Sequence, residues 1–376
     1  MKIIVATDSF KGSLSSIEAG KAICEGIVKA IPEAEALLVP IADGGEGTVE
    51  ALVCGMGGHY EYAFVSDPLG RSVEARYGVV GNSTAVIEMS AAAGLTLLPE
   101  EERNPLFTTT YGVGELIADA VEKGYRDFII GIGGSATNDG GVGMLQALGF
   151  GILDKNGKPV PHGAVGLRDV AEVTVNGVIK ELSDCTFKIA CDVTNVLCGE
   201  NGCSKVFAPQ KGANDEDIAL MDEWMKHYAD VVEERMPLSD RNMKGAGAAG
   251  GLGFAFSSFL SAEMMGGIDI VMKLTSLEDK IKDSDIVITG EGRLDKQSAM
   301  GKAPLGVATL AKKYGKTVLA FAGDVDGGTE DYKHIGIDEC YSIAEEGLPL
   351  KERMKRDVAY GNLVKTVYGV FSRLNN

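Results

Sequence analysis

Apolar residues at the start of the chain first have the pattern of a buried strand and then that of an amphipathic helix. Residues 2–6 are Lys-Ile-Ile-Val-Ala, and apolar side chains then recur with helical spacing at positions 19, 22, 23, 27 and 30. Ser15, with Glu18 three residues later, predicts a capping box at the start of the helix, and Pro32 predicts its end. A second strand is predicted at 35–40. This strand–helix–strand order predicts a parallel sheet with helices on its faces.

The pattern changes between residues 60 and 98, where short strand-like runs follow one another without a helix between them. The runs cover 60–65, 73–80 and 85–89, and the turn sequences Asp-Pro-Leu-Gly at 67–70 and Gly-Asn at 81–82 separate them. These signals predict hairpins. Helix and strand patterns alternate again from 112 to 153, and a strand at 187–190 and a helix near 215–235 follow.

The last third of the chain returns to a regular alternation. We predict strands at 285–289, 317–322 and 339–343, and helices near 303–313 and 352–373. The predicted fold class is therefore α/β with two domains. Residues 1–65 together with 285–376 are predicted to form a Rossmann-like, doubly wound domain, and residues 66–284 an inserted mixed α/β domain.

The composition limits the kinds of partner that the protein is expected to bind and the cellular compartment in which it is expected to lie. The 376 residues carry a formal net charge of −18, which argues against nucleic acid or an anionic membrane surface as the main partner. The seven cysteines include no C-x-x-C pair, so we expect reduced thiols rather than disulfides or a zinc site. No secretory signal is visible, and the longest run of low polarity, 245–262, has five glycines and predicts a loop leading into a buried helix. We expect a cytoplasmic protein.

Glycine is abundant, with 50 residues, and acidic residues repeatedly stand beside glycines just after apolar runs. Three such segments are 42–48, 131–141 and 289–295. Glycine lets backbone N–H groups surround an anion, and a neighbouring carboxylate can hold Mg²⁺ or accept a proton. The three segments together predict an enzyme that handles phosphate.

The sequence also narrows the type of phosphate chemistry. A Walker-A loop is absent because Ala303 follows the Gly-Lys at 301–302, and no histidine stands in an H-R-D sequence, which excludes a protein kinase. Gly131-x-Gly133-x-x-Ala136 follows a strand, with an aspartate at 154, and so also fits a dinucleotide fingerprint, although residues 138–141 would delay the next helix. An NAD-linked oxidoreductase of a small hydroxy acid therefore stays open as an alternative.

Aspartates follow the ends of several predicted strands. They are Asp8, Asp43, Asp192, Asp295 and Asp324. In an open α/β sheet, ligands bind at the carboxyl ends of the strands, so these side chains are candidates for a site. Because none of the four histidines lies in these segments, we expect a carboxylate as the general base.

Taken together, the motifs resemble those of the type I glycerate kinase family. The matching segments follow the family order and cover 8–15, 40–48, 133–141, 192–195, 209–213, 245–253, 289–295, 297–298 and 301–304. They extend over nearly the whole chain and are specific as a set. Two positions depart from the family pattern, since Val196 replaces a usual proline and Cys203 replaces a usual alanine.

The resemblance implies an ATP-dependent kinase that phosphorylates D-glycerate to 2-phosphoglycerate with Mg²⁺. It also implies a two-domain α/β fold without a Walker-A loop and a site in the interdomain cleft. Only the family indicates which hydroxyl is phosphorylated, so 3-phosphoglycerate stays open as the product. A catalytically inactive sugar-acid binding protein is a further alternative. We expect a small-molecule substrate, no nucleic acid or membrane partner, and a monomer or homodimer.

Phosphoryl transfer depends mainly on positioning and charge neutralisation, and the motifs supply candidates for four roles. Donors of one glycine-rich loop are expected to bind the ATP phosphates, from Gly133, Gly134, Ser135, Asn138 and Asp139. Positive charges for the substrate carboxylate and the transferred phosphoryl group are expected from Lys11, Arg293 and Lys211. The carboxylates expected to hold Mg²⁺ are Asp43, Glu46 and Glu291. Asp192 is the predicted general base, with Asp295 as the alternative.

Overall fold

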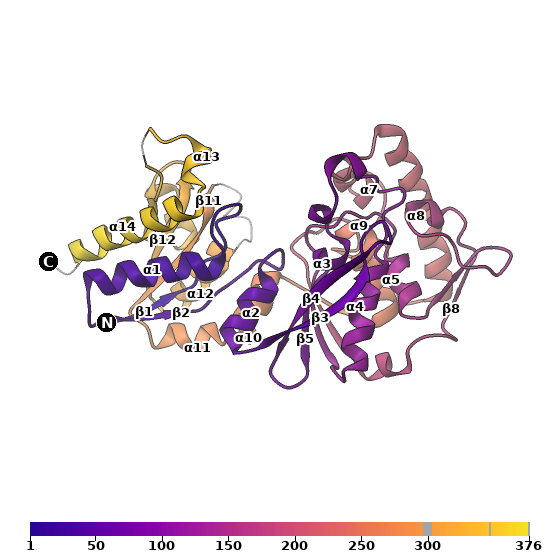
Figure 1. Cartoon of the computed structure of the whole chain (residues 1–376), viewed down its shortest axis with the longest axis horizontal. Helices are drawn as coiled ribbons and strands as arrows, with labels where there is room; N and C mark the ends of the chain where they lie inside the picture. Colours follow the sequence, from indigo (N-terminus) through magenta and orange to yellow (C-terminus); the bar gives the residue numbers. More distant parts are fainter. Residues whose placement is uncertain (296–302, 346, 375–376) are drawn as a thin grey trace. The chain divides into compact units, whose positions relative to one another are not determined.

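Two compact units make up the computed structural model, which describes residues 1–295, 303–345 and 347–374 (Figure 1). Unit 1 consists of Met1–Asp43, Glu50–Gly57 and Ile268–Asn376, and unit 2 of Gly44–Val49 and Gly58–Gly267. Each unit has its own β-sheet and its own covering helices. The predicted fold class, a doubly wound α/β part with an inserted mixed α/β part, is confirmed.

The limits of the units can be compared with the domain boundaries predicted after residues 65 and 284. Residues 58–65 belong to unit 2 because they form a strand that pairs with residues 72–80 of that unit. Residues 268–284 belong to unit 1, where Ile268 lies so close to Gly306 that a Cβ there would be 3.0 Å from it. We propose that each unit is a folding domain.

The sheet of unit 1 has five parallel strands in the order β13-β12-β11-β1-β2. The strands are β1 (Lys2–Val5), β2 (Glu35–Leu38), β11 (Ile286–Leu294), β12 (Thr317–Val325) and β13 (Glu339–Ser342). From β1 the chain proceeds to β2 on one side, and from β11 it proceeds to β12 and β13 on the other. The topological switch point therefore lies between β1 and β11, and ligands of open α/β sheets bind at such points.

Helices cover the sheet of unit 1, and its central strands β1, β11 and β12 are largely buried. The consecutive residues Ile3, Ile4 and Val5 are all inaccessible, as expected for a parallel sheet. Helices α1 (Ser16–Ala30) and α14 (Arg356–Leu374) lie side by side (Figure 1) and share a core with β1, β11 and β12. The other helices of this part of the chain are α2 (Thr48–Met56), α10 (Gly267–Leu274), α11 (Leu277–Lys282), α12 (Ala303–Lys313) and α13 (Leu350–Arg353).

Local sequence signals predict the start of the first helix of unit 1 correctly, but they do not predict the start of its last helix. The predicted capping box forms, because Ser15 Oγ accepts the backbone N–H of Glu18 while the Glu18 carboxylate accepts that of Ser15. The helix predicted near 352–373 is found as α14, but its start was placed too early, since α13 ends at Arg353 and α14 begins at Arg356. Neither glycine nor proline marks this break, so the sequence pattern does not reveal it.

β11 extends to Leu294, whereas the sequence predicted a strand that ends at residue 289. Glycine is depleted in strands, and Gly290 therefore favoured a loop. In the structure this glycine permits close pairing, because a Cβ at Gly290 would lie 2.1 Å from the carbonyl oxygen of Phe321 on β12. As a result, Glu291 and Arg293 are held on a strand rather than on a loop.

The main sheet of unit 2 is mixed, in the order β10-β9-β6-β5-β4-β3. Its strands are β3 (His59–Ser66), β4 (Ser72–Val80), β5 (Thr84–Glu88), β6 (Asp127–Gly131), β9 (Thr186–Ala190) and β10 (Glu263–Met265). β3, β4 and β5 pair antiparallel and confirm the hairpins predicted between 60 and 89, and the remaining pairs are parallel. A separate antiparallel pair is formed by β7 (Gly151–Leu153) and β8 (Glu172–Thr174).

The helices of unit 2 pack around one large apolar core. They are α3 (Ser90–Ala93), α4 (Tyr111–Glu122), α5 (Val142–Ala147), α6 (Ala164–Leu167), α7 (Cys203–Phe207), α8 (Asp215–Arg235) and α9 (Ala248–Leu260). α8 has the predicted bounds, and α9 begins in the glycine-rich run with a left-handed backbone at Ala249, Gly250 and Gly251. Among the helices of the described residues, none combines the length and the apolar character needed to cross a membrane.

Candidate functional site

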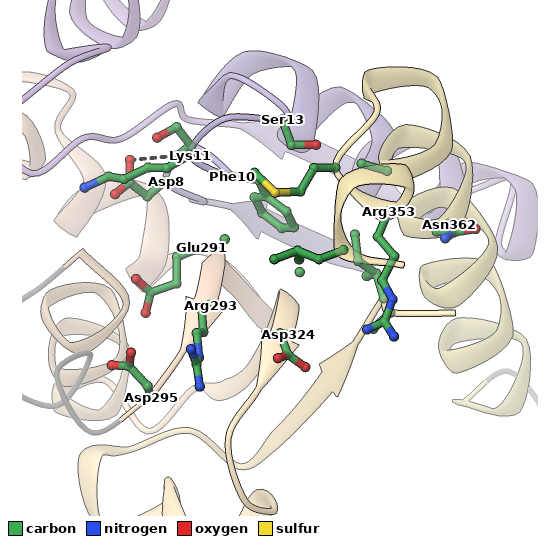
Figure 2. Close-up of a pocket in the computed structure, with 18 residues that line it drawn as sticks. Asp8, Phe10, Lys11, Ser13, Glu291, Arg293, Asp295, Asp324, Arg353 and Asn362 are labelled. Atoms are coloured by element: carbon green, nitrogen blue, oxygen red, sulfur yellow. Dashed lines mark hydrogen bonds between the residues drawn. The ribbon is translucent and has the colours of Figure 1, made fainter. Parts of the chain in front are cut away.

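A cavity of about 350 Å³ lies in unit 1 at the carboxyl ends of β1, β11, β12 and β13 (Figure 2). Its polar lining consists of Asp8, Ser9, Lys11, Ser13, Glu291, Arg293, Asp295, Asp324, Arg353 and Asn362. The position coincides with the switch point between β1 and β11. The volume falls within the range of roughly 300–1,000 Å³ that small-molecule sites occupy.

Asp8 is fixed at this switch point just after β1. Its backbone N–H donates to the carbonyl of Gly290 on β11 at 2.9 Å, and its Oδ1 accepts the N–H of Ser9 at 2.6 Å. The residue is 5% exposed. Burial raises the pKa of Asp8 to about 7, and the neighbouring Asp43 carboxylate adds to the rise. A carboxyl group with such a pKa can exchange a proton near neutral pH.

Lys11 forms an ion pair with the predicted metal ligand Asp43. Lys11 Nζ lies 3.3 Å from Asp43 Oδ2, and 68% of the lysine side chain is exposed. Partial burial opposes the charged form, but the carboxylates of Asp43 and Asp8 outweigh it and raise the pKa of Lys11. An ion pair this exposed is worth little in folding, so the ammonium group can turn to a bound anion at low cost.

Three predicted site residues, two on β11 and one directly after it, line the same cavity. Glu291, Arg293 and Asp295 are two positions apart, which puts their side chains on one side of the strand (Figure 2). Glu291 is 7% exposed, whereas Arg293 is exposed. Asp324 on β12 pairs with Arg293 in the parallel register and also lines the cavity. The structure therefore brings acids and a guanidinium group together at one sheet edge.

Six of the ten polar residues that line this cavity had no role predicted from the sequence, among them two acids, an arginine and an asparagine. Asp8 and Asp324 were noted only as acids that follow strands, and Arg353 and Asn362 were not noticed. Asp8 opens the matching segment 8–15, which could have marked it. Arg353 ends α13 and Asn362 lies in α14, outside all the matching segments, and nothing in the local sequence distinguishes them.

The predicted phosphate loop lies in unit 2, between β6 and α5. Gly133 and Gly134 are exposed, and Gly134 has a φ of 75° that favours glycine. Within the described ranges, the backbone N–H groups of Gly133, Gly134 and Ser135 donate to no other group of the chain. The loop is held by the bridge between Ser135 and Gly94, so its free N–H groups are kept in place. Such groups suit an anion.

Lys211 supports this loop from inside unit 2. It is 5% exposed, and its Nζ donates to Ser135 Oγ at 2.7 Å and to the carbonyl of Thr137 at 2.6 Å. Burial lowers the pKa of Lys211 to about 8. The lysine thus carries its charge to the back of the loop, where it orients Ser135.

Asn138 and Asp139 are fully buried rather than exposed to a ligand. The Asp139 carboxylate accepts the backbone N–H groups of Thr110, Gly141 and Gly143 and the Thr110 hydroxyl, which closes the first turn of α5. Burial raises the pKa of Asp139, although these hydrogen bonds oppose the rise. The Asn138 amide donates to the hydroxyl of Ser204 at 2.9 Å. Both residues therefore hold the loop in shape.

The remaining predicted residues of unit 2, Glu46 and Asp192, are exposed. Asp192 follows β9, and its Oδ1 accepts the N–H of Gly267 at 2.9 Å. Glu46 lies in the loop 44–47, which passes so close to β6 that a Cβ at Gly131 would be 2.4 Å from the carbonyl oxygen of Gly44. This close approach explains why residue 131 is a glycine.

The predicted site residues fall into two groups. Those of unit 1 are Lys11, Asp43, Glu291, Arg293 and Asp295, and those of unit 2 are Glu46, Gly133, Gly134, Ser135, Asn138, Asp139, Asp192 and Lys211. The motif residues 297–298 and 301–302 lie outside the described residues.

The acids of unit 1 suit a magnesium ion that is held mainly by its substrate. In the part of the chain that the structure describes, no group of three or more acidic, histidine or cysteine side chains is placed to hold a metal. Mg²⁺ in kinases is usually bound by one or two carboxylates together with phosphates and water, so a full protein cage is not required. Burial raises the pKa of Asp8, repulsion by Asp43 and Glu291 adds to the rise, and Lys11 opposes it; a bound cation would reduce this repulsion.

Comparisons with known proteins identify the family of the chain. The pattern of the glycerate kinase family matches residues 3–375. Glycerate 2-kinase of Escherichia coli K12 is 45% identical over 100% of this chain and 98% of its own length. Glycerate kinase of Bacillus subtilis 168 is 44% identical over 98% of this chain and 100% of its own. A crystal structure of putative glycerate kinase 2 from Salmonella typhimurium LT2 superposes with a TM-score of 0.91 at 43% identity, covering 100% of this chain and 98% of the other. The chain belongs to the glycerate kinase family and is a kinase.

Proposed function

We propose that this kinase transfers the γ-phosphoryl group of ATP to the 2-hydroxyl of D-glycerate and requires Mg²⁺. The observation that carries the proposal is the cavity at the switch point of unit 1, where a lysine, two arginines and four acids converge. Full-length relatives named as glycerate kinases support the substrate, and the E. coli relative, named glycerate 2-kinase, supports the position of the phosphoryl group. We further propose a cytoplasmic enzyme that acts as a monomer or homodimer.

Lys11 and Arg293 are proposed to bind the carboxylate of glycerate and the phosphoryl group during transfer. Both line the cavity, and both have exposed side chains that a small anion can reach. A guanidinium group can grip a carboxylate with two parallel hydrogen bonds, whereas an ammonium group acts as a point charge. The pair is therefore able to orient a three-carbon hydroxy acid by its carboxylate end.

The loop 133–141 is proposed to bind ATP phosphates through the free N–H groups of Gly133, Gly134 and Ser135. Lys211 positions Ser135 and adds a positive charge behind the loop. Asn138 and Asp139 are proposed to hold the loop, because their burial leaves no surface for the nucleotide.

Asp43, Glu46 and Glu291 are proposed to hold Mg²⁺, directly or through water. The ion would neutralise the charge that the phosphoryl group shares with its leaving group. Lys11 is paired with Asp43 in the structure, and it would be free to turn to the substrate once a cation takes that place.

A carboxylate is proposed to accept the proton of the glycerate hydroxyl. Asp192 and Asp295 are the residues predicted from sequence, and the first is exposed beside Gly267 while the second lines the cavity. The structure adds Asp8 as a third candidate, since it is buried in the same cavity next to Lys11 and Asp43. A base with a pKa near the working pH transfers protons most effectively.

A coupled assay of ADP release with D-glycerate, L-glycerate and tartronate tests the proposed reaction. We expect turnover that depends on D-glycerate and stops on removal of Mg²⁺. A thermal-shift experiment with ATP and Mg²⁺ against NAD separates the kinase from the oxidoreductase alternative, because a ligand that binds only the folded state raises Tm. Stabilisation by NAD without ADP release would overturn the proposal.

A further inference from the structure

The cavity of unit 1 has an apolar half that glycerate would leave empty. Besides its polar residues, the cavity is lined by Phe10, Ile343, Leu350, Met354 and Ala359. Figure 2 shows Asp8, Lys11 and Glu291 on one side of Phe10, and Arg353 and Asn362 on the other. A three-carbon acid carries a charge and two hydroxyls and has almost no apolar surface. A second chemical group with flat apolar faces is therefore needed to fill this half.

Two polar side chains stand in the apolar half. Arg353 is half-buried at the end of α13, and its Nε donates to the carbonyl of Leu348 at 2.5 Å. This bond holds the guanidinium group at Nε, and its Nη groups have no partner within the described ranges. Asn362 is half-buried on α14, and its amide makes no hydrogen bond within the described ranges. Both groups line the cavity and are available to a ligand.

These groups match the chemistry of a purine nucleoside. An asparagine amide pairs with the N6 and N7 edge of adenine through one donor and one acceptor, and a planar guanidinium group stacks on a base. Asp324, at the carboxyl end of β12, lines the same cavity and offers a carboxylate of the kind that accepts a ribose hydroxyl in doubly wound folds. Phe10 and Met354 supply the apolar contacts.

We infer that the half of the cavity lined by Arg353 and Asn362 binds the adenosine part of ATP. The inference rests on the proposed kinase reaction. Asn362 hydrogen-bonds to the N6 and N7 edge of the base, Arg353 stacks on the base, and Asp324 binds the ribose. The acids and cations of the other half are then left for glycerate, for the metal and for the terminal phosphate.

Kinetics of the two substrates test the inference. Asn362→Ala should raise the KM for ATP about tenfold or more, as expected for the loss of a bidentate base contact, and should leave the KM for D-glycerate within about twofold. Arg353→Ala should also raise the KM for ATP. Lys351→Ala and Asp357→Ala are matched controls on the same two helices, because both side chains are exposed and neither lines the cavity. Both controls should retain the wild-type constants.

A comparison of ATP with inosine triphosphate measures the preference for the base. A general structural defect of the variant would not change this preference. Inosine replaces the N6 donor of adenine with an acceptor, so the wild type should prefer ATP and Asn362→Ala should lose most of this preference. Asn362→Ser serves as the second variant if the alanine variant does not fold. Unchanged KM for ATP and unchanged base preference in folded variants would overturn the inference.

Calorimetric binding of ADP separates this inference from the proposed reaction. If the wild type binds ADP and Asn362→Ala binds it about tenfold more weakly, the base site is supported even in a protein that does not phosphorylate glycerate. If the wild type turns over D-glycerate while both variants bind ADP normally, the reaction stands and the base site is wrong. A rise in the KM for D-glycerate alone would assign this half of the cavity to the acid instead.

Discussion

Replacing Asp8 by asparagine should make the protein more stable at neutral pH while it reduces kinase activity. Asp8 is 5% exposed, lies in the candidate cavity and is repelled by Asp43 and Glu291. Its folded state therefore carries a cost that a neutral side chain of the same shape would not. In the Asp8→Asn protein, the oxygen of the new amide can still accept the N–H of Ser9.

The size of the effect follows from the pKa. Burial raises the pKa of Asp8 from 3.8 to about 7. At about 1.36 kcal/mol for each pH unit, this corresponds to about 4 kcal/mol. Between pH 4 and pH 7 the folded state binds more protons than the unfolded state, so the free energy of unfolding of the wild type falls as pH rises through this window. Asp8→Asn should therefore gain almost nothing near pH 4 and about 2–4 kcal/mol above pH 7.

Urea unfolding followed by circular dichroism, with a chelator present to remove metal ions, measures this difference from about pH 4.5 to about pH 8.5. Asp283→Asn is the matched control, because Asp283 is an exposed aspartate of unit 1. It should show no such pH dependence relative to the wild type. A stability difference that does not change with pH, or an Asp8→Asn protein that is less stable than the wild type at pH 8, would refute the reasoning.

Further predictions concern the other candidate residues. Lys11→Ala should raise the KM for D-glycerate or lower kcat more than about tenfold in the coupled assay, and normal kinetics would remove Lys11 from the site. Asp192→Asn should nearly abolish kcat with little change in the KM for D-glycerate; if Asp295→Asn does so instead, the base is misassigned. For Lys211, whose pKa burial lowers to about 8, the unfolded state binds more protons between pH 8 and 10.5, so stability should rise with pH in this range. Trp224 fluorescence in unit 2 can follow this rise, and a Lys211→Met protein that shows the same rise would contradict the assignment.

Local signals were sufficient for much of the fold. The capping box of Ser15 and Glu18, the turn sequences between 60 and 89 and the helix at 215–235 each depend on a few neighbouring residues, and each is found where it was predicted. The length of β11 was underestimated because Gly290 reads as a loop residue. In the structure, Gly290 allows β11 to approach Phe321 closely. Phe321 is 31 positions away in the chain, so a local sequence pattern cannot reveal this contact.

The candidate site was predicted less completely because sequence motifs do not report burial. Asp139 lies in a glycine-rich segment, as many ligand-binding residues do. Its carboxylate, however, accepts hydrogen bonds from backbone N–H groups of its own unit. Asp8 was noted only as an acid that follows a strand, but it is buried, and the Asp43 and Glu291 carboxylates raise its pKa further. Arg353 and Asn362 reach the cavity through the packing of α13 and α14, which no motif encodes.

We propose that this chain phosphorylates D-glycerate at its 2-hydroxyl. The most direct test incubates the purified protein with ATP, Mg²⁺ and D-glycerate and identifies the product by correlated ³¹P–¹H NMR. We expect 2-phosphoglycerate, recognised by coupling of the phosphorus to the single proton on carbon 2. Coupling to the two protons on carbon 3 would keep the kinase but contradict the proposed position. No phosphorylated product from D-glycerate, L-glycerate or tartronate would contradict the proposed reaction.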